Sequence, residues 1–160
     1  TAAIDGCNMK VRRIITILLV VLISATLAFI WGNSMKSVED SQEMSLGVLE
    51  KIKPVLEIFV GAGNVTDHLV RKLAHFTEFA ALGLELVLLV ILLGRVRFQA
   101  VINCAFFGLA AAVVDETIQI FSDRGSQVQD VWLDFAGVCA GLLATLIIYI
   151  PIKAHRRRTQ

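Results

Sequence analysis

The chain has 160 residues, of which 56% are hydrophobic and 18% are charged, and its formal net charge is +1. Its mean hydropathy of +0.73 is too high for a soluble domain of this length. Composition therefore indicates one membrane domain over residues 1–160, and the small net charge gives no reason to expect a nucleic-acid partner.

The first predicted membrane span is the uncharged run of residues 14–32. A helix of this length reaches about 28 Å, which is enough to cross the hydrocarbon core of a bilayer. Because Lys10, Arg12 and Arg13 precede the run, a signal peptide is the alternative, but the run continues past its best cleavage-like site. Residues 1–8 are interpreted as a cloning remnant or a short upstream extension, without a function.

A polar region with an amphipathic segment follows the first span. Within residues 41–60 the apolar side chains share one face of a helix, which predicts an amphipathic helix lying on the extracytoplasmic surface of the bilayer. Pro54 should kink this helix or divide it. A solvated linker with chance periodicity is the alternative.

Three further spans are predicted, over residues 73–93, 98–114 and 131–150. The helix of the third span is expected to continue to Phe121. Ser126-Gln-Val-Gln129 has the form of a capping box that opens the fourth span.

Small residues in the fourth span predict where it packs against another helix. Gly137 and Gly141 follow Asp134 on one face at a spacing of three to four residues, and Ala144 comes next. Such a stripe predicts close packing against a neighbouring helix, because small side chains let two backbones approach.

The distribution of charge predicts the orientation. If both termini are cytoplasmic, nine of the 15 lysines and arginines lie on the inner side, as the positive-inside rule requires. Trp31 and Trp132 then both lie at the outer interface. The expected fold is an all-α integral membrane bundle of four transmembrane helices plus an interfacial helix, multi-pass in the plasma membrane.

Polar side chains gather at the extracytoplasmic ends of the last three spans in this topology. Ionisable groups within a span cost several kcal/mol unless they are paired or hydrated, and they are usually functional. The acids outnumber the cations, so a proton, a divalent cation at the acidic cluster or a cationic ligand is expected there. The residues are Arg71, Lys72, His75, Glu78, Asp115, Glu116, Gln119, Arg124, Asp130 and Asp134.

The residues leave several functions open. A purely structural network would pair the arginines with acids, whereas a binding site would use them to hold a phosphate or a carboxylate. In an enzyme, His75 would be the general base or nucleophile, oriented by Glu78, and acids would hold a divalent ion. The alternative is that His75 and Glu78, three residues apart, ligate a metal directly. Glu85 lies deeper in the second span, with Asn103 as its expected partner, and a proton-coupled transporter would use Glu85 and His75 as relay groups.

Three segments carry a resemblance to a known family: RKLAHFTEFAALG at residues 71–83, DETIQIF at 115–121 and DVWLDFAGVCAG at 130–141. Together they resemble the VanZ-like family of small membrane proteins associated with teicoplanin resistance. Two departures are Phe79, where the family often has Tyr, and a turn before Arg124 that is one residue shorter than usual. The resemblance points to the same ten polar residues and to Gly137.

The resemblance implies a role at the cell envelope in resistance to glycopeptide or lipoglycopeptide antibiotics. The favoured interpretation is a pocket that binds an anionic envelope component or limits access of the antibiotic, with Arg71, Lys72, Asp115, Gln119, Arg124, Asp130 and Asp134 as ligand-binding residues. The alternative is a membrane-embedded enzyme acting on a lipid-linked phosphate or peptidoglycan precursor, with His75, Glu78 and Glu116 as catalytic residues. Membrane lipids, and a lipid-linked cell-wall precursor or the antibiotic, are the expected partners.

Overall fold

A computed structural model describes residues 2–36, 46–47, 53–54, 57–58, 61, 65–122 and 125–158, with side chains described between residues 9 and 155. This part of the chain contains four long helices and no strand. They are α1 (Ala2–Ser34), α3 (Asp67–Leu92), α4 (Phe98–Phe121) and α5 (Val128–Arg158). Each contains a stretch long and apolar enough to cross a membrane. The all-helical, four-span prediction is therefore confirmed.

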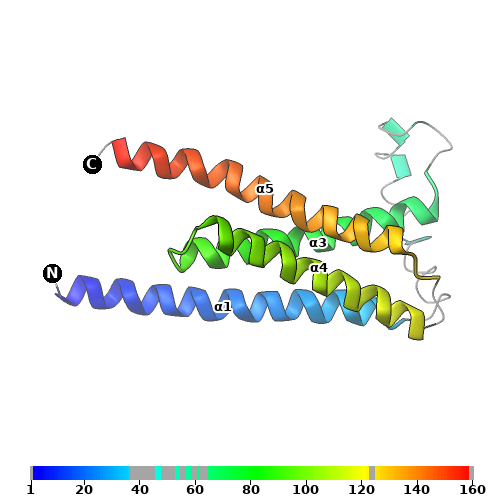
Figure 1. Cartoon of the computed structure of the whole chain (residues 1–160), viewed down its shortest axis with the longest axis horizontal. Coiled ribbons are helices and arrows are strands. Elements are labelled where there is room, and N and C mark those ends of the chain that lie inside the picture. Colours follow the sequence, from blue (N-terminus) through cyan, green and yellow to red (C-terminus); the bar gives the residue numbers. More distant parts are fainter. Residues whose placement is uncertain are drawn as a thin grey trace.

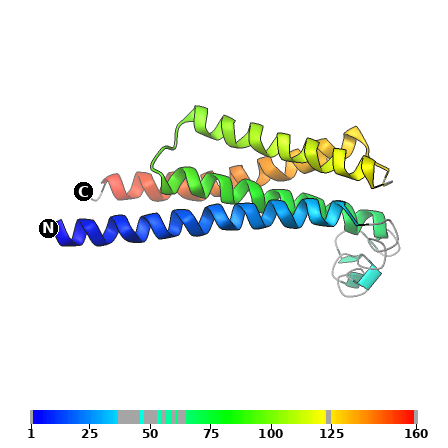
Figure 2. The same ribbon diagram turned by 90° about the horizontal axis from the view of Figure 1, so that it is seen from below.

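The helices lie side by side and form a bundle with two distinct ends (Figures 1 and 2). Both chain termini and the turn between α3 and α4 lie at one end, here called the terminal end. The last turn of α1, the first turns of α3 and α5, and the last turns of α4 lie at the other, here called the pocket end. The segments that carry the polar residues are thus brought to one end of the bundle.

The helix boundaries follow from local sequence. Helix α3 begins at Asp67 rather than at residue 73, because Thr66 Oγ1 accepts a hydrogen bond of 3.2 Å from the Leu69 amide and caps the helix. Gly94 follows the end of α3 with a φ of +68°, a conformation that favours glycine. Helix α4 ends at Phe121, as predicted.

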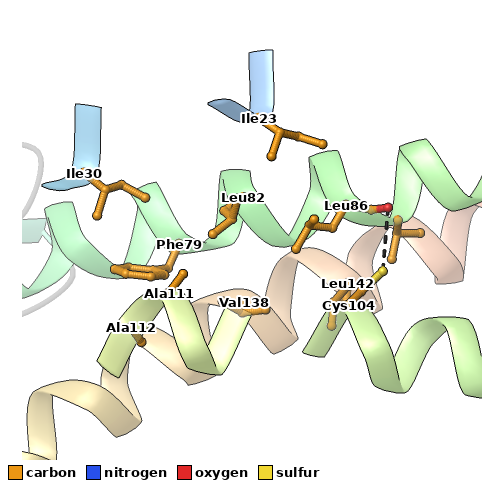
Figure 3. Close-up of a cluster of buried hydrophobic side chains, with 11 residues drawn as sticks. Ile23, Ile30, Phe79, Leu82, Leu86, Cys104, Ala111, Ala112, Val138 and Leu142 are labelled. Carbon is orange, nitrogen blue, oxygen red and sulfur yellow. Dashed lines mark hydrogen bonds between the residues drawn. The ribbon is translucent and has the colours of Figure 1, made fainter. Parts of the chain in front are cut away.

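The buried core runs along the centre of the bundle, with α3 in contact with all three other helices (Figure 3). Its fully buried apolar side chains come from every helix, which is why no helix can rotate without disturbing the others. They include Ile30 of α1, Phe79, Leu82 and Val87 of α3, Ala112 of α4 and Val138 of α5.

The closest approach is between α3 and α5, and small residues permit it. A Cβ atom at Gly137 would meet the backbone of Phe76, and one at Gly141 would meet the backbone of Ala80. These contacts confirm that Gly137 and Gly141 form a packing face. Ala144, in contrast, is exposed and lies outside that face.

Two predictions about local structure need correction. The capping box is wrong: α5 begins at Val128, and the Ser126 hydroxyl donates 2.5 Å to Glu116 Oε2 instead of capping the helix. The pairing of Glu85 with Asn103 is also wrong. Glu85 Oε1 accepts 2.9 Å from Thr26 Oγ1, whereas exposed Asn103 accepts 3.0 Å from Gln99, one turn away on its own helix.

Most of the predicted amphipathic helix at residues 41–60 lies outside the described residues. Its existence and its place on the bilayer surface stay predictions.

Candidate functional site

A cavity of about 310 Å³ opens at the pocket end. The first turns of α3 supply one wall, the last turns of α4 another, and the turn before α5 with its first turns the third. Its lining residues are His68, Arg71, Lys72, His75, Glu116, Gln119, Gly125, Gln127, Asp130, Leu133 and Asp134.

The cavity brings together most of the residues that the sequence pointed to. Seven of the ten predicted site residues line it, and Asp115 contacts the lining residues His75 and Gln119 from α4. Glu78 faces elsewhere, as described below. Arg124 belongs to residues 123–124, which lie outside the described residues.

The floor of the cavity is a histidine between two buried carboxylates. His75 Nδ1 of α3 lies 3.6 Å from Asp115 Oδ2 of α4 and 3.8 Å from Asp134 Oδ1 of α5. Both aspartates are 0% exposed, whereas the His75 side chain retains 17% exposure. Three helices therefore each contribute one ionisable group to the same point.

Asp115 is held in place by hydrogen bonds from two helices. Ser34 Oγ, at the end of α1, donates 2.7 Å to Asp115 Oδ1, and Gln119 Nε2 donates 2.9 Å to Asp115 Oδ2. The same Gln119 nitrogen also donates 2.9 Å to Glu116 Oε1. Positions 115, 116 and 119 suit this arrangement, because residues three and four apart are neighbours on a helix surface.

The upper wall carries the positive charge. Lys72 Nζ lies 3.0 Å from Asp130 Oδ1, and both side chains are partly exposed. Arg71 also lines the cavity and is half-buried, but among the residues that the structure describes it forms no ion pair. The cavity thus has a cationic wall above an acidic floor.

The polar side chains predicted on α3 face different neighbouring helices. His75 faces α4 and α5, whereas Glu78 lies within 3.5 Å of Asn33 on α1 and lines a shallow hollow beside α1. Glu85 likewise faces α1, through Thr26. Two positions three residues apart point about 60° apart on a helix, which is enough to direct them to different partners.

Several site residues were missed by sequence reasoning. Helix α1 was predicted only to anchor the chain, but Ser34 bonds Asp115 and Asn33 contacts Glu78. His68 and Ser126 were also missed, the second because it was assigned to a helix cap. The available signal was that Asn33 and Ser34 are the first polar pair after the apolar run.

The chemistry of the cavity follows from its charges. Among the described residues, four carboxylates (Asp115, Glu116, Asp130 and Asp134) stand against the two cations Arg71 and Lys72. The acidic floor suits a cation, while the guanidinium and ammonium groups above it suit an anion such as a phosphate. The arrangement can therefore hold ligand groups of both signs.

Comparison with known proteins gives one match. The VanZ/LLP1 family description matches residues 14–149, which is most of the chain. No curated protein and no solved structure matches. The matched range includes all four spans in part or whole and every predicted site residue. The chain is a membrane protein and belongs to the VanZ/LLP1 family.

Proposed function

We propose that this protein binds the phosphate-bearing headgroup of an envelope lipid or lipid-linked cell-wall precursor in its cavity, and that this binding lowers susceptibility to teicoplanin-type antibiotics. The protein acts in the plasma membrane. The antibiotic part of the proposal rests on the resemblance to VanZ-like proteins, and the ligand part rests on the charges of the cavity.

The observation that carries the ligand proposal is the position of Arg71. Its guanidinium group is half-buried at a cavity that also contains Lys72, and it forms no ion pair among the described residues. In a purely structural network, a half-buried arginine beside four carboxylates would be paired with one of them. An arginine at the cavity wall without an ion pair to any described residue suits a bidentate contact with phosphate oxygens.

The proposal places the pocket end outside the cell and both termini in the cytoplasm. Its support is the bias of lysine and arginine toward the terminal end, where nine of the 15 occur. A lipid headgroup of the outer leaflet then lies level with the cavity mouth.

Cysteine labelling tests this orientation in a background in which Cys7, Cys104 and Cys139 are alanine. Gln127→Cys at the pocket end and Gln99→Cys at the terminal end change the same residue type, and both positions are exposed. We expect a membrane-impermeant maleimide added to intact cells to label the first and spare the second. The reverse pattern would contradict the orientation and the outer-leaflet ligand.

Binding of dodecyl phosphate, a phosphate group on an apolar chain, tests the ligand proposal. Arg71→Gln should weaken binding to the purified protein in detergent roughly 10- to 100-fold, because a hydrogen bond to a charged group contributes about 1.5–3 kcal/mol. Arg95→Gln is the control, since Arg95 is exposed at the terminal end. Equal affinities of the two variants, or no preference for dodecyl phosphate over a neutral dodecyl detergent, would refute the proposal.

A second candidate function is favoured by His75. Its imidazole contacts two buried carboxylates at the floor of the same cavity, which is a suitable position for a general base acting on a lipid-linked phosphate. Glu116 also lines the cavity, whereas Glu78 contacts Asn33 of α1 and does not line it, so its role in the reaction stays a prediction. Turnover of a bound phosphate ester, abolished in His75→Ala, would favour the enzyme over the binding protein.

A further inference from the structure

We propose that the floor of the cavity is a binding site for one divalent transition-metal ion, with His75, Asp115 and Asp134 as its protein ligands. The ion is of the Zn²⁺ or Mn²⁺ class, and its remaining coordination position faces the cavity. The proposal rests on the geometry of these three side chains and is independent of the phosphate headgroup.

The distances between the three ligands fit an ion. One potential ligand atom from each residue lies within 4.8 Å of the other two. His75 Nδ1 is 3.6 Å and 3.8 Å from the nearest oxygens of the two aspartates, beyond the usual length of a direct hydrogen bond. Two ligands that are each about 2.1 Å from a tetrahedral ion lie about 3.4 Å apart, so the two His75 separations need to close only slightly. The Asp115 and Asp134 oxygens, which lie within 4.8 Å of each other, would close by up to about 1.4 Å.

Asp134 gives an independent reason to expect a cation. Its side chain is 1% exposed and lines the cavity, and neither carboxylate oxygen accepts a hydrogen bond from the described residues. A buried ionised carboxylate without hydrogen bonds is strongly unfavourable unless it takes up a proton or a bound cation compensates its charge, and a transition-metal ion competes with the proton for this position. Asp115 is a second buried carboxylate facing the same imidazole, which increases the negative potential at this point.

The hydrogen bonds around Asp115 are those expected of a carboxylate held in position to bind a metal ion. Ser34 Oγ and Gln119 Nε2 donate to its two oxygens at 2.7 Å and 2.9 Å, which fixes the plane of the carboxylate. Hydrogen bonds of this kind hold ligating carboxylates in the correct direction, and removing one typically weakens metal affinity 10- to 100-fold.

The ligand set decides which ions fit. An imidazole nitrogen disfavours Ca²⁺, which takes six to eight oxygen ligands. Imidazole favours Zn²⁺ and similar ions, while carboxylates also accept Mn²⁺. Three protein ligands with one open position is the pattern of zinc sites that bind a further molecule. In this protein, the open position faces the cavity, where a water or an oxygen of an anionic ligand would complete it.

Metal content of the full chain in detergent tests the proposal. The protein is stripped with a chelator and dialysed against buffered Zn²⁺ or Mn²⁺, and bound metal is measured by mass spectrometry alongside the melting temperature. We expect one ion per chain and a higher melting temperature. Asp134→Asn should lose the ion and Ser34→Ala should bind roughly 10- to 100-fold more weakly.

The control is Glu85→Gln, which neutralises another buried carboxylate that does not line the cavity. It should bind the ion as the wild type does. Stripped Asp134→Asn should melt at or above the temperature of the stripped wild type, because the change removes a buried charge facing His75 and Asp115.

Failure of the wild type to bind Zn²⁺ or Mn²⁺ overturns the proposal, as does unchanged binding in Asp134→Asn. If Asp134→Asn does not fold, Ser34→Ala takes its place, and unchanged affinity in that variant overturns the proposal instead. No dodecyl phosphate is present in these measurements. A protein that binds the ion but not dodecyl phosphate would therefore refute the proposed function and leave the metal site standing.

Discussion

His75→Ala is expected to return teicoplanin susceptibility to that of cells lacking the protein, while the amount of protein in the membrane stays unchanged. The imidazole lies at the cavity floor and contacts carboxylates of two other helices, so the proposed metal site and the proposed general base both depend on it. Its side chain is 17% exposed and borders a polar cavity, where water can replace the lost ring. Packing around α3 should therefore survive.

The measurement compares antibiotic susceptibility, membrane abundance and melting temperature in detergent. Melting is recorded after removal of metal, so that loss of a bound ion does not count as loss of packing. His155→Ala is the matched control, because His155 lies on α5 toward the terminal end and is exposed. A parallel loss of resistance and stability in His75→Ala would favour a purely structural network over a ligand site.

The sequence was sufficient to predict the spans and the convergence of polar groups at one end. Long apolar runs fix the helices, and short turns between the last three spans force their ends to alternate between the two sides. The last turns of α4, which carry Asp115, must then meet the first turns of α3 and α5, which carry His75 and Asp134. The meeting of these polar residues at one end requires only that the predicted spans are helical.

The partners of individual side chains were less predictable, because they depend on how each helix is rotated and on which helices are neighbours. Asn103 was expected to be the partner of Glu85, but Thr26 is its partner because α1 packs against that face of α3. The role of Ser34 was hidden for the same reason. A single serine at a helix end has no periodicity that would assign it to a site.

Asp115→Ala is expected to lower the free energy of unfolding by about 3 kcal/mol. The change leaves the buried hydroxyl of Ser34 without its carboxylate acceptor and removes one of the two hydrogen bonds that the buried Gln119 amide donates, the other going to Glu116. Each hydrogen bond to a charged group contributes about 1.5–3 kcal/mol, and reduced repulsion with Asp134 offsets part of the combined loss. Because Ser34 belongs to α1, the weakening should loosen the attachment of α1 to α4.

Asp130→Ala is the matched comparison, since Asp130 pairs with Lys72 at the same cavity but both side chains are partly exposed. Loss of that pair should cost about 1 kcal/mol or less. Unfolding of the metal-free protein in mixed micelles, followed by circular dichroism, measures both variants. Similar destabilisation by the two changes would show that the buried hydrogen bonds of Asp115 contribute little. With the expected difference, Asp115→Ala removes both a proposed metal ligand and stability, whereas His75→Ala removes a metal ligand from an intact bundle, so only Asp115→Ala should weaken the metal-free protein.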